Sequence, residues 1–335
     1  MNYFLIGYYG FGNSGDTASL FKVKKLILSI DTNADFKELH SSNINQQHLV
    51  YRWSFISIFK AIFWSDKIVF GGGSLLQNTT SSLSLYYYLS LILLCRMFGK
   101  PVIFLSQGIG PILGLFDQFL VTVFLKLVNK LSVRDQFSYS LFKLNVKQQI
   151  VLGSDITLFN EKKVFKPEVK DFSVGFALKP SHINDLFLRQ IFIASQHVST
   201  KQYCFAFFPK QDVGIYNMLG IAGSSVYQVT NLFNQANFPK PQIMVVMRYH
   251  AAIWAALNGI PFLAISTDPK LDSISKSLGQ ESYTIDNNEF NLNLFNTKLN
   301  HIFELFDDYQ DKLVYNVEEL IKLTENHKEL FYETK

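Results

Sequence analysis

The chain has 335 residues, enough for two domains of ordinary size. Hydrophobic residues make up 48% of it and charged residues 17%, which argues against a disordered chain. The net charge of +4, from 31 basic and 27 acidic residues, is too small to define a surface that binds nucleic acid, but it is compatible with an anionic small substrate. Only two cysteines are present, Cys95 and Cys204, so we expect no metal site and a reducing, cytoplasmic setting.

The N-terminal residues MNYFLIGYYGFG lack the basic stretch and the small-residue cleavage site of a signal peptide. The most apolar segment, residues 83–97, is shorter than the ~20 residues that a membrane span needs, and Arg96 and Lys100 close it. We expect a buried helix there, and a helix that rests on a membrane surface is the alternative. Contact with the inner face of the membrane therefore stays open for a cytoplasmic protein.

Apolar runs alternate with helical stretches along the first half of the chain. In chain order, we predict strands within 3–8, 66–70, 100–111, 130–135 and 148–157, and helices over 17–30, 83–97, 117–129 and 138–144. The strands are nearly continuous in apolar residues and end in glycine-rich turns. This pattern is typical of a parallel, doubly wound α/β sheet that helices cover on both faces.

The polar stretch 161–171, EKKVFKPEVKD, is the best candidate for a linker, and the same rhythm restarts after it. We predict strands within 172–178, 203–209, near 225, 241–250 and 261–266, with helices after 183, near 213–219, and over 251–259, 270–278 and 294–331. The expected architecture is two Rossmann-like domains, 1–162 and 163–335, that face each other across a cleft as in GT-B glycosyltransferases. Ligands of such sheets bind at the carboxyl ends of the strands.

The first glycine loop, GYYGFGNSGD, runs from Gly7 to Asp16 and includes Gly12 and Gly15. It can bring the backbone close to an anion at the N-terminus of the next helix, or it can be a tight turn with Asp16 as the helix cap. Residues 10–15 match the GxGxxG spacing of dinucleotide-binding proteins. The acidic partner expected at the end of a second strand is missing, because Asp31 and Asp35 fall in a stretch predicted as a polar loop, so we do not predict NAD binding.

Two further glycine loops follow predicted strands. The second carries Gly71, Gly72, Gly73 and Ser74, whose backbone N–H groups could hold a phosphate or carboxylate. A steric need for glycine where the two domains face each other would require the same residues, and the two explanations stay equal. The third loop carries Gln107 and Gly108, and Gln107 could bind a ligand or bond to the loop itself.

Ionisable side chains follow three more predicted strands. Arg134 ends SVRD, where it could pair with Asp135 or bind a carboxylate or phosphate. Arg248, Tyr249 and His250 stand at the start of an apolar helix, whose dipole opposes cations, so an anionic ligand would explain them. The next strand delivers Ser266, Asp268 and Lys270 to the same edge. This convergence favours a functional site, with an imidazole that suits general acid or base catalysis.

Taken in order, these stretches resemble the polysaccharide pyruvyltransferase family. The matching segments, between residue 3 and about residue 280, are GYYGFGNSGD, SDKIVFGGGSLLQ, GKPVIFLSQGIGP, SVRD, GSDI, MRYHAAIWAALNGIP and AIS-x-DPK. The resemblance implies a GT-B-like fold, no metal or cofactor, phosphoenolpyruvate as donor co-substrate, and as acceptor a sugar of a cell-surface polysaccharide, free or lipid-linked. Pyruvate would be transferred to the sugar as a ketal.

The resemblance also assigns roles to individual residues. Asp16 becomes the catalytic base, and His250 the catalytic acid. Phosphoenolpyruvate would be bound by Arg134, Arg248, Tyr249, His250 and Lys270. Three positions depart from the family pattern: Thr17 replaces a glutamate, Tyr249 a leucine, and Thr267 an aromatic residue.

Two other functions remain open. A GT-B glycosyltransferase that uses a nucleotide sugar would share the fold, although the sequence has no clear Glu-x7-Glu pattern for the donor ribose and offers only Asp268 there. A catalytically degenerate homologue that binds polysaccharide is favoured by Thr17, and opposed by the retention of Asp16, Arg134, His250 and Lys270.

Overall fold

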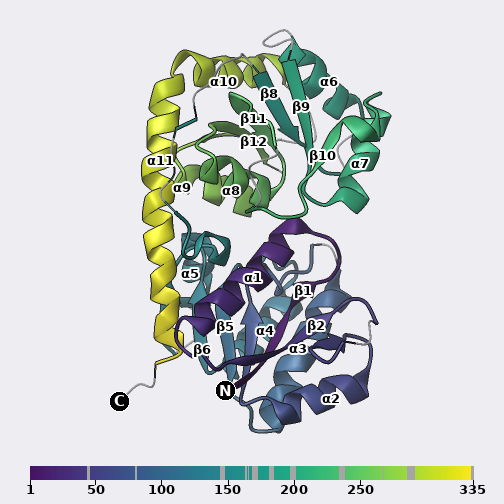
Figure 1. Cartoon of the computed structure of the whole chain (residues 1–335), viewed down its shortest axis with the longest axis vertical. Helices are drawn as coiled ribbons and strands as arrows, with labels where there is room; N and C mark the ends of the chain where they lie inside the picture. Colours follow the sequence, from purple (N-terminus) through teal and green to yellow (C-terminus); the bar gives the residue numbers. More distant parts are fainter. Residues whose placement is uncertain are drawn as a thin grey trace. The chain divides into compact units, whose positions relative to one another are not determined.

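A computed structural model describes the chain except for residues 44–45, 80, 144–147, 163, 165, 168–172, 181–184, 197–200, 234–237, 267, 285–290 and 333–335. The chain forms two compact units (Figure 1). The first contains residues 1–11, 15–161 and 320–335, and the second contains residues 12–14 and 162–319. Each unit is built around its own parallel sheet, and each is described separately below.

The first unit has a seven-stranded parallel sheet in the order β3-β2-β1-β4-β5-β6-β7. Its strands are β1 (Asn2–Tyr9), β2 (Asp35–His40), β3 (Leu49–Tyr51), β4 (Lys67–Gly71), β5 (Val102–Gln107), β6 (Lys130–Val133) and β7 (Ile150–Leu152). The central strands are apolar because both of their faces are covered, and every residue of β5 is buried. Ile6 of β1 pairs with Phe70 of β4 in parallel, so the loops that follow these two strands leave the same edge of the sheet.

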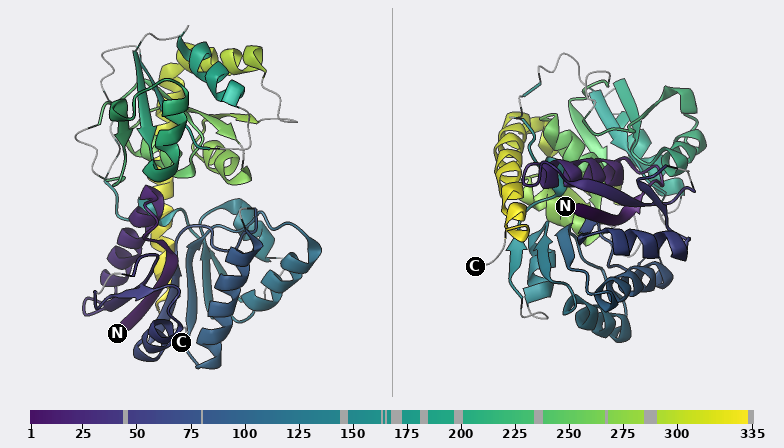
Figure 2. Two further views of the ribbon diagram at one scale, coloured as in Figure 1. Left: turned by 90° about the vertical axis from the view of Figure 1, so that its right-hand side faces the viewer. Right: turned by 60° about the horizontal axis from the view of Figure 1, so that its bottom comes forward.

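Helices cover both faces of this sheet. They are α1 (Ser14–Leu28), α2 (Phe55–Trp64), α3 (Ser82–Met97), α4 (Leu115–Leu125) and α5 (Gln136–Lys143), with 3-10 turns η1 (Ile156–Leu158) and η3 (Thr324–Leu330). The helices α2 to α5 pack in one hydrophobic core, whereas α1 and the C-terminal segment pack in the core on the opposite face (Figure 2). Within the described residues, no helix combines the length and the apolar character needed to cross a membrane.

The second unit has a six-stranded parallel sheet in the order β10-β9-β8-β11-β12-β13. Its strands are β8 (Ser173–Ala177), β9 (Lys201–Ala206), β10 (Val226–Gln228), β11 (Ile243–Val246), β12 (Phe262–Ser266) and β13 (Glu281–Thr284). Its helices are α6 (Asp185–Gln196), α7 (Pro209–Met218), α8 (Tyr249–Leu257), α9 (Pro269–Ser277), α10 (Leu292–Glu304) and α11 (Phe306–Leu323), with the 3-10 turn η2 (Gly223–Ser225). The last four residues of α11 belong to the first unit. The apolar helix α8 is buried from Ala251 to Leu257.

The predicted fold class is confirmed, but four elements were not predicted from the sequence. They are β2, β3, α2 and β13. The strand β2, DFKELH, is half charged, and it is a strand because it lies between β1 and β3. The sequence predicts a polar loop at Asp35, and this prediction is wrong, because Asp35 is the first residue of the strand β2. The predicted 294–331 helix is divided into α10, α11 and η3, and the helix predicted after residue 183 is α6.

The C-terminal segment completes the first unit. We predicted that residues 163–335 form one domain, yet residues 320–335 belong to the unit that starts the chain. His327 explains this difference, because its ring is fully buried against the ends of β6 and β7. Its Nε2 lies 2.7 Å from the carbonyl of Ser154 and donates to it, and its Nδ1 lies 2.8 Å from Ser132 Oγ. A Cβ on Gly153 would collide with this ring, so a glycine is needed there.

The buried His327 ring predicts a pH-dependent loss of stability in the first unit. Burial lowers the pKa of His327 to about 4 from its ordinary value of 6.5. The unfolded chain therefore takes up a proton at a higher pH than the folded chain, and stability is lost as the pH falls from 6.5 towards 4. The expected loss is ~3 kcal/mol, measured by urea unfolding across this range. His327→Gln should show a shallower dependence on pH, and equal slopes for the two proteins would contradict the prediction.

Candidate functional site

The second and third glycine loops meet at the carboxyl edge of the first sheet. The Gly72 N–H donates to the Leu105 carbonyl at 2.9 Å, and the Gly108 N–H donates to the Gly73 carbonyl at 2.8 Å. Gly72 has a φ of 69°, and a Cβ there would lie 2.8 Å from the Cβ of Ser19 on α1. The close approach of α1 is therefore sufficient to explain this glycine.

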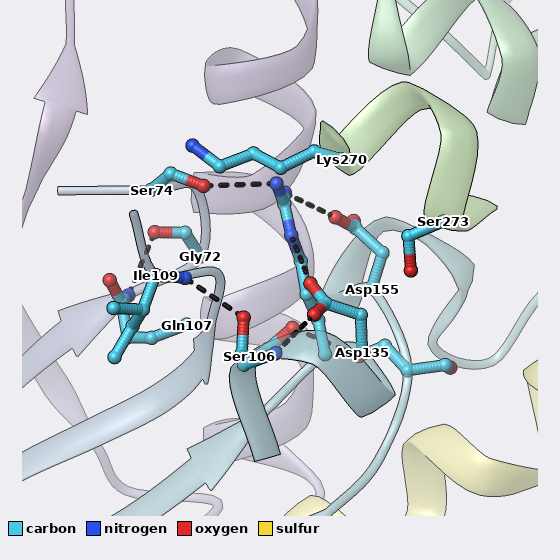
Figure 3. Close-up of polar contacts among 12 residues, drawn as sticks. Gly72, Ser74, Ser106, Gln107, Ile109, Asp135, Asp155, Lys270 and Ser273 are labelled. Carbon is cyan, nitrogen blue, oxygen red and sulfur yellow. Dashed lines mark hydrogen bonds and ion pairs between the residues drawn. The ribbon is translucent and has the colours of Figure 1, made fainter. Parts of the chain in front are cut away.

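Hydrogen bonds from the Gln107 side chain fix the second glycine loop. The Nε2 of Gln107 donates to the carbonyls of Phe70 at 3.0 Å and Gly72 at 2.8 Å, and its side chain is buried (Figure 3). These bonds fix the end of β4 to the end of β5. Of the two roles that we considered for Gln107, the structure therefore shows a bond to loop backbone, although the loop belongs to the neighbouring strand.

Arg134 is buried among polar groups from three strand ends. Its Nη1 lies 2.9 Å from Asp155 Oδ2, its Nη2 donates to Ser74 Oγ at 3.0 Å, and its Nε lies 3.7 Å from Asp135 Oδ2. Figure 3 shows Ser74, Asp135 and Asp155 around this point. The guanidinium thus faces two carboxylates, and the ion pair with Asp155 is shorter than the one with Asp135 that we considered from the sequence. Its predicted role in anion binding stays a prediction.

Asp16 lies in the first turn of α1, beside the second glycine loop. Its Oδ1 is 3.4 Å from the position that a Cβ on Gly73 would take. Burial, followed by the charge of Asp16, raises the pKa of Tyr8 and that of Tyr9. The carboxylate is half-buried, so it remains accessible to a ligand, and the neighbouring Thr17 side chain is exposed.

Arg52 is a buried cation at the same edge that sequence reasoning did not find. Its guanidinium carbon lies 4.9 Å from the ring centre of Phe11 and 5.1 Å from that of Tyr87, and its Nη2 donates to Tyr88 Oη at 3.1 Å. In the part of the chain that the structure describes, no carboxylate forms an ion pair with it. Ring faces therefore stabilise this charge beside the first glycine loop. The residue follows β3, which was itself not predicted.

The second unit contains a cavity of about 180 Å³ at the carboxyl edge of its sheet. Its polar lining comes from the ends of several strands and the helices that follow them. The lining residues are Asn13, Lys179, Phe207, Met247, Arg248, Tyr249, His250, Asp268, Lys270 and Leu271. The four residues of this unit that we predicted to bind the donor, Arg248, Tyr249, His250 and Lys270, therefore line one cavity.

Arg248 is held in place by a buried carboxylate. It stands at the N-cap position of α8, forms an ion pair with Asp212, and donates to Gln211 Oε1 at 3.1 Å. Asp212 is fully buried and also accepts from the backbone N–H groups of Phe207 at 3.1 Å and Phe208 at 2.8 Å. Burial raises the pKa of Asp212, and the Arg248 guanidinium opposes that shift. About a fifth of the Arg248 side chain stays exposed, so the guanidinium can still meet a ligand.

Lys179 adds a third cation to the cavity. It follows β8, and burial together with the positive charge of Arg248 lowers its pKa. Lys270 lies in the first turn of α9, where Asp268 caps the helix and accepts from the Lys270 N–H at 3.0 Å. Among the described residues, three cations and the His250 imidazole thus line a small cavity with one carboxylate, Asp268. Such an excess of positive charge suits a small, multiply charged anion.

The tip of the first glycine loop belongs to the second unit. Residues 12–14 cluster with it, and both the N–H and the Oγ of Ser14 donate to the carbonyl of Phe207, at 3.0 and 2.8 Å. The adjacent Asn13 lines the cavity. The loop that we predicted to bind a ligand through Gly12 and Gly15 is therefore divided between the two units, with Asp16 in the first.

Solved structures place this fold among GT-B proteins. The chain is 13% identical to the Anabaena HepE protein in complex with UDP-glucose, with a TM-score of 0.54 over 98% of this chain and 99% of that one. It is 11% identical to a glycosyltransferase from Rickettsia africae, with a TM-score of 0.56 over 99% of each chain. It is 13% identical to the lipopolysaccharide outer core galactosyltransferase WaaB, with a TM-score of 0.51 over 99% of this chain and 98% of that one. These likenesses show a GT-B-like fold.

The family of the chain follows from its sequence. The model of the polysaccharide pyruvyl transferase family matches residues 13–269, which include the second and third glycine loops and the cavity residues from Asn13 to Asp268, and end just before Lys270 and Leu271. The chain belongs to this family, and the predicted resemblance is confirmed. No curated protein matches the sequence.

The close packing of Gly108 against Arg134 predicts that a methyl group added at Gly108 lowers the stability of the protein. A Cβ on Gly108 would lie 2.5 Å from Ser74 Oγ and 2.6 Å from Arg134 Nε, so Gly108→Ala should separate Arg134 from Ser74. We expect a loss of ~1–3 kcal/mol in unfolding free energy, measured by urea unfolding. In the control Gly214→Ala, on α7, the methyl group meets open space, and stability should hold or rise by ~0.5–1 kcal/mol. Equal stabilities of the two variants would contradict this account.

Proposed function

We propose that this protein transfers pyruvate from phosphoenolpyruvate to a sugar diol, as a ketal, during synthesis of a cell-surface polysaccharide. Membership of the polysaccharide pyruvyl transferase family supports the transfer of a pyruvyl group. The observation that carries the proposal is the cavity of the second unit, where Lys179, Arg248 and Lys270 lie with His250. The saccharide acceptor, free or lipid-linked, is proposed from the family alone.

The charge of the donor matches that of the cavity. Phosphoenolpyruvate carries a phosphate and a carboxylate within a few bonds, so it needs several cations in a small volume. Arg248 is oriented by Asp212 and can offer its remaining N–H groups, while Lys179 and Lys270 come from two other strand ends. We assign the donor to this cavity, with Tyr249 and His250 at the start of α8 beside it.

The reaction requires one proton at carbon and the loss of phosphate. An acid, proposed to be His250, protonates the C3 methylene, and C2 becomes an oxocarbenium centre. A sugar hydroxyl, deprotonated by the proposed base Asp16, forms the first C2–O bond. The C2–O bond to phosphate then breaks with its electron pair, and a neighbouring hydroxyl forms the second C2–O bond. Of the two hydroxyl protons, one restores the acid that gave its proton to C3, and the other leaves with the phosphate. The products are therefore the ketal and inorganic phosphate.

The role of His250 predicts that turnover depends on this side chain. We expect phosphate release from phosphoenolpyruvate with sugars that have free 4,6-diols, and a fall of at least roughly 100-fold in kcat for His250→Ala. The control His48→Ala changes an exposed histidine of the first unit and should keep its activity. Circular dichroism should show that both variants fold. Normal turnover in folded His250→Ala would remove His250 from the mechanism.

Calorimetry, together with the phosphate-release assay, distinguishes a pyruvyltransferase from the main alternative, a glycosyltransferase. A glycosyltransferase would bind a nucleotide sugar, as the Anabaena HepE structure with UDP-glucose does. Calorimetry with UDP-sugars should detect no binding if the cavity takes phosphoenolpyruvate. Tight binding of a UDP-sugar without acceptor-dependent phosphate release would instead establish the glycosyltransferase. Failure to bind either donor would indicate a degenerate homologue, in agreement with Thr17.

Lys179 predicts how donor affinity depends on pH. Because its pKa is lowered, Lys179 loses its charge at a lower pH than an ordinary lysine, and a bound anion would stabilise the charged form. Affinity for phosphoenolpyruvate should therefore fall as the pH rises through the lowered pKa. By calorimetry near neutral pH, Lys179→Met should bind phosphoenolpyruvate roughly tenfold more weakly than the wild type. Its affinity should also change less than that of the wild type as the pH is raised. The exposed-lysine control Lys276→Met should match the wild type, and identical pH profiles for wild type and Lys179→Met would contradict this role.

A further inference from the structure

The outer surface of the first unit has an unusual number of exposed apolar side chains on α2, α3 and α4. Eight of them are between 61% and 84% exposed: Phe55, Ile56, Phe63, Leu83, Met97, Leu115, Phe116 and Phe119. We call these eight residues the apolar face. Isolated exposed apolar side chains are common, but a group of this size on three neighbouring helices indicates a binding surface.

The three helices form one continuous layer. Phe98, directly after α3, contacts Phe63 of α2 with ring centres 4.8 Å apart. Tyr86 of α3 donates to Asp117 of α4 at 2.7 Å. All three helices pack on one face of the sheet, through their buried sides, so their other sides are directed outward together (Figure 2). A groove of about 530 Å³, lined by Ile112, Leu115 and Phe119 among others, extends this face beside α4.

Basic residues outnumber acidic ones in the segment that contains these three helices. Residues 55–126 include five basic residues and only two acidic ones, Asp66 and Asp117. Asp117 is buried and bonded to Tyr86 and Asn78, and Asp66 follows α2 and accepts from the backbone of Asn2. Lys60 of α2 and Lys126 at the end of α4 are exposed. Exposed lysines that accompany large apolar side chains are typical of helices that bind at a membrane interface.

We propose that the apolar face binds the surface of a lipid bilayer with anionic headgroups. The apolar side chains would enter the interface, while Lys60 and Lys126 meet the headgroup charges. A second copy of the chain is the less favourable occupant, because two such faces would bring like charges together. The proposal concerns the surface alone and does not depend on which donor or acceptor the protein uses.

Sedimentation with vesicles tests the proposal without any activity assay. The full-length protein should sediment with vesicles of phosphatidylcholine and phosphatidylglycerol, and less with phosphatidylcholine alone. Ile56→Ser/Phe116→Ser should reduce the partition coefficient by at least roughly tenfold. Lys60→Glu/Lys126→Glu should reduce it by roughly fivefold for each lysine removed, and added salt should weaken binding of the wild type more than that of this variant.

A matched control comes from the second unit. Ile193 and Tyr315 are exposed by 53% and 66% but lie outside the apolar face, so Ile193→Ser/Tyr315→Ser should bind vesicles as the wild type does. Equal losses in this control and in Ile56→Ser/Phe116→Ser would overturn the proposal, as would a failure of the wild type to bind any vesicle. A dimer in size-exclusion chromatography that Ile56→Ser/Phe116→Ser abolishes, without vesicle binding, would show that a second copy covers the face.

Discussion

A buried guanidinium has to be neutralised, and this requirement organises the edge of the first sheet. Arg134 leaves β6 with only 3% of its side chain exposed, so its charge depends on Asp155 beyond β7 and on Ser74 beyond β4. The surrounding backbone must then come close, and Gly108 is the residue that allows it. The Arg134–Asp155 ion pair therefore accounts for part of the conformation of the second and third glycine loops.

The second unit uses an arginine and an aspartate in a different way. Asp212 is fully buried, but Arg248 keeps part of its side chain exposed at the cavity, next to Lys179 and Lys270. One carboxylate therefore orients the arginine without enclosing it. This contrast bears on the proposed donor site. The charge of Arg134 is already balanced within the protein, whereas the cavity of the second unit has more cations than carboxylates, which is why we assign phosphoenolpyruvate to it.

Sequence reasoning found the elements whose signals are local. Buried parallel strands such as β5 and β12 are mainly apolar runs, and Arg248, His250 and Lys270 follow within a few residues of such runs, so both the sheets and these cavity residues could be predicted. The charged strand β2 has no such signal, since it is held by its neighbours. Asp212 is 36 residues from Arg248, and nothing in the sequence around it indicates this partner. Arg52 was missed because β3, the strand before it, is only three residues long.

The late arrival of the His327 segment has a consequence for biosynthesis. Small domains at the start of a chain usually fold while the ribosome is still at work. Here, residues 320–335 are made after every strand of both sheets, yet the first unit needs them to cover the ends of β6 and β7. The sheet of the second unit is complete in sequence by Thr284. The unit translated first is therefore the one that reaches its finished form last.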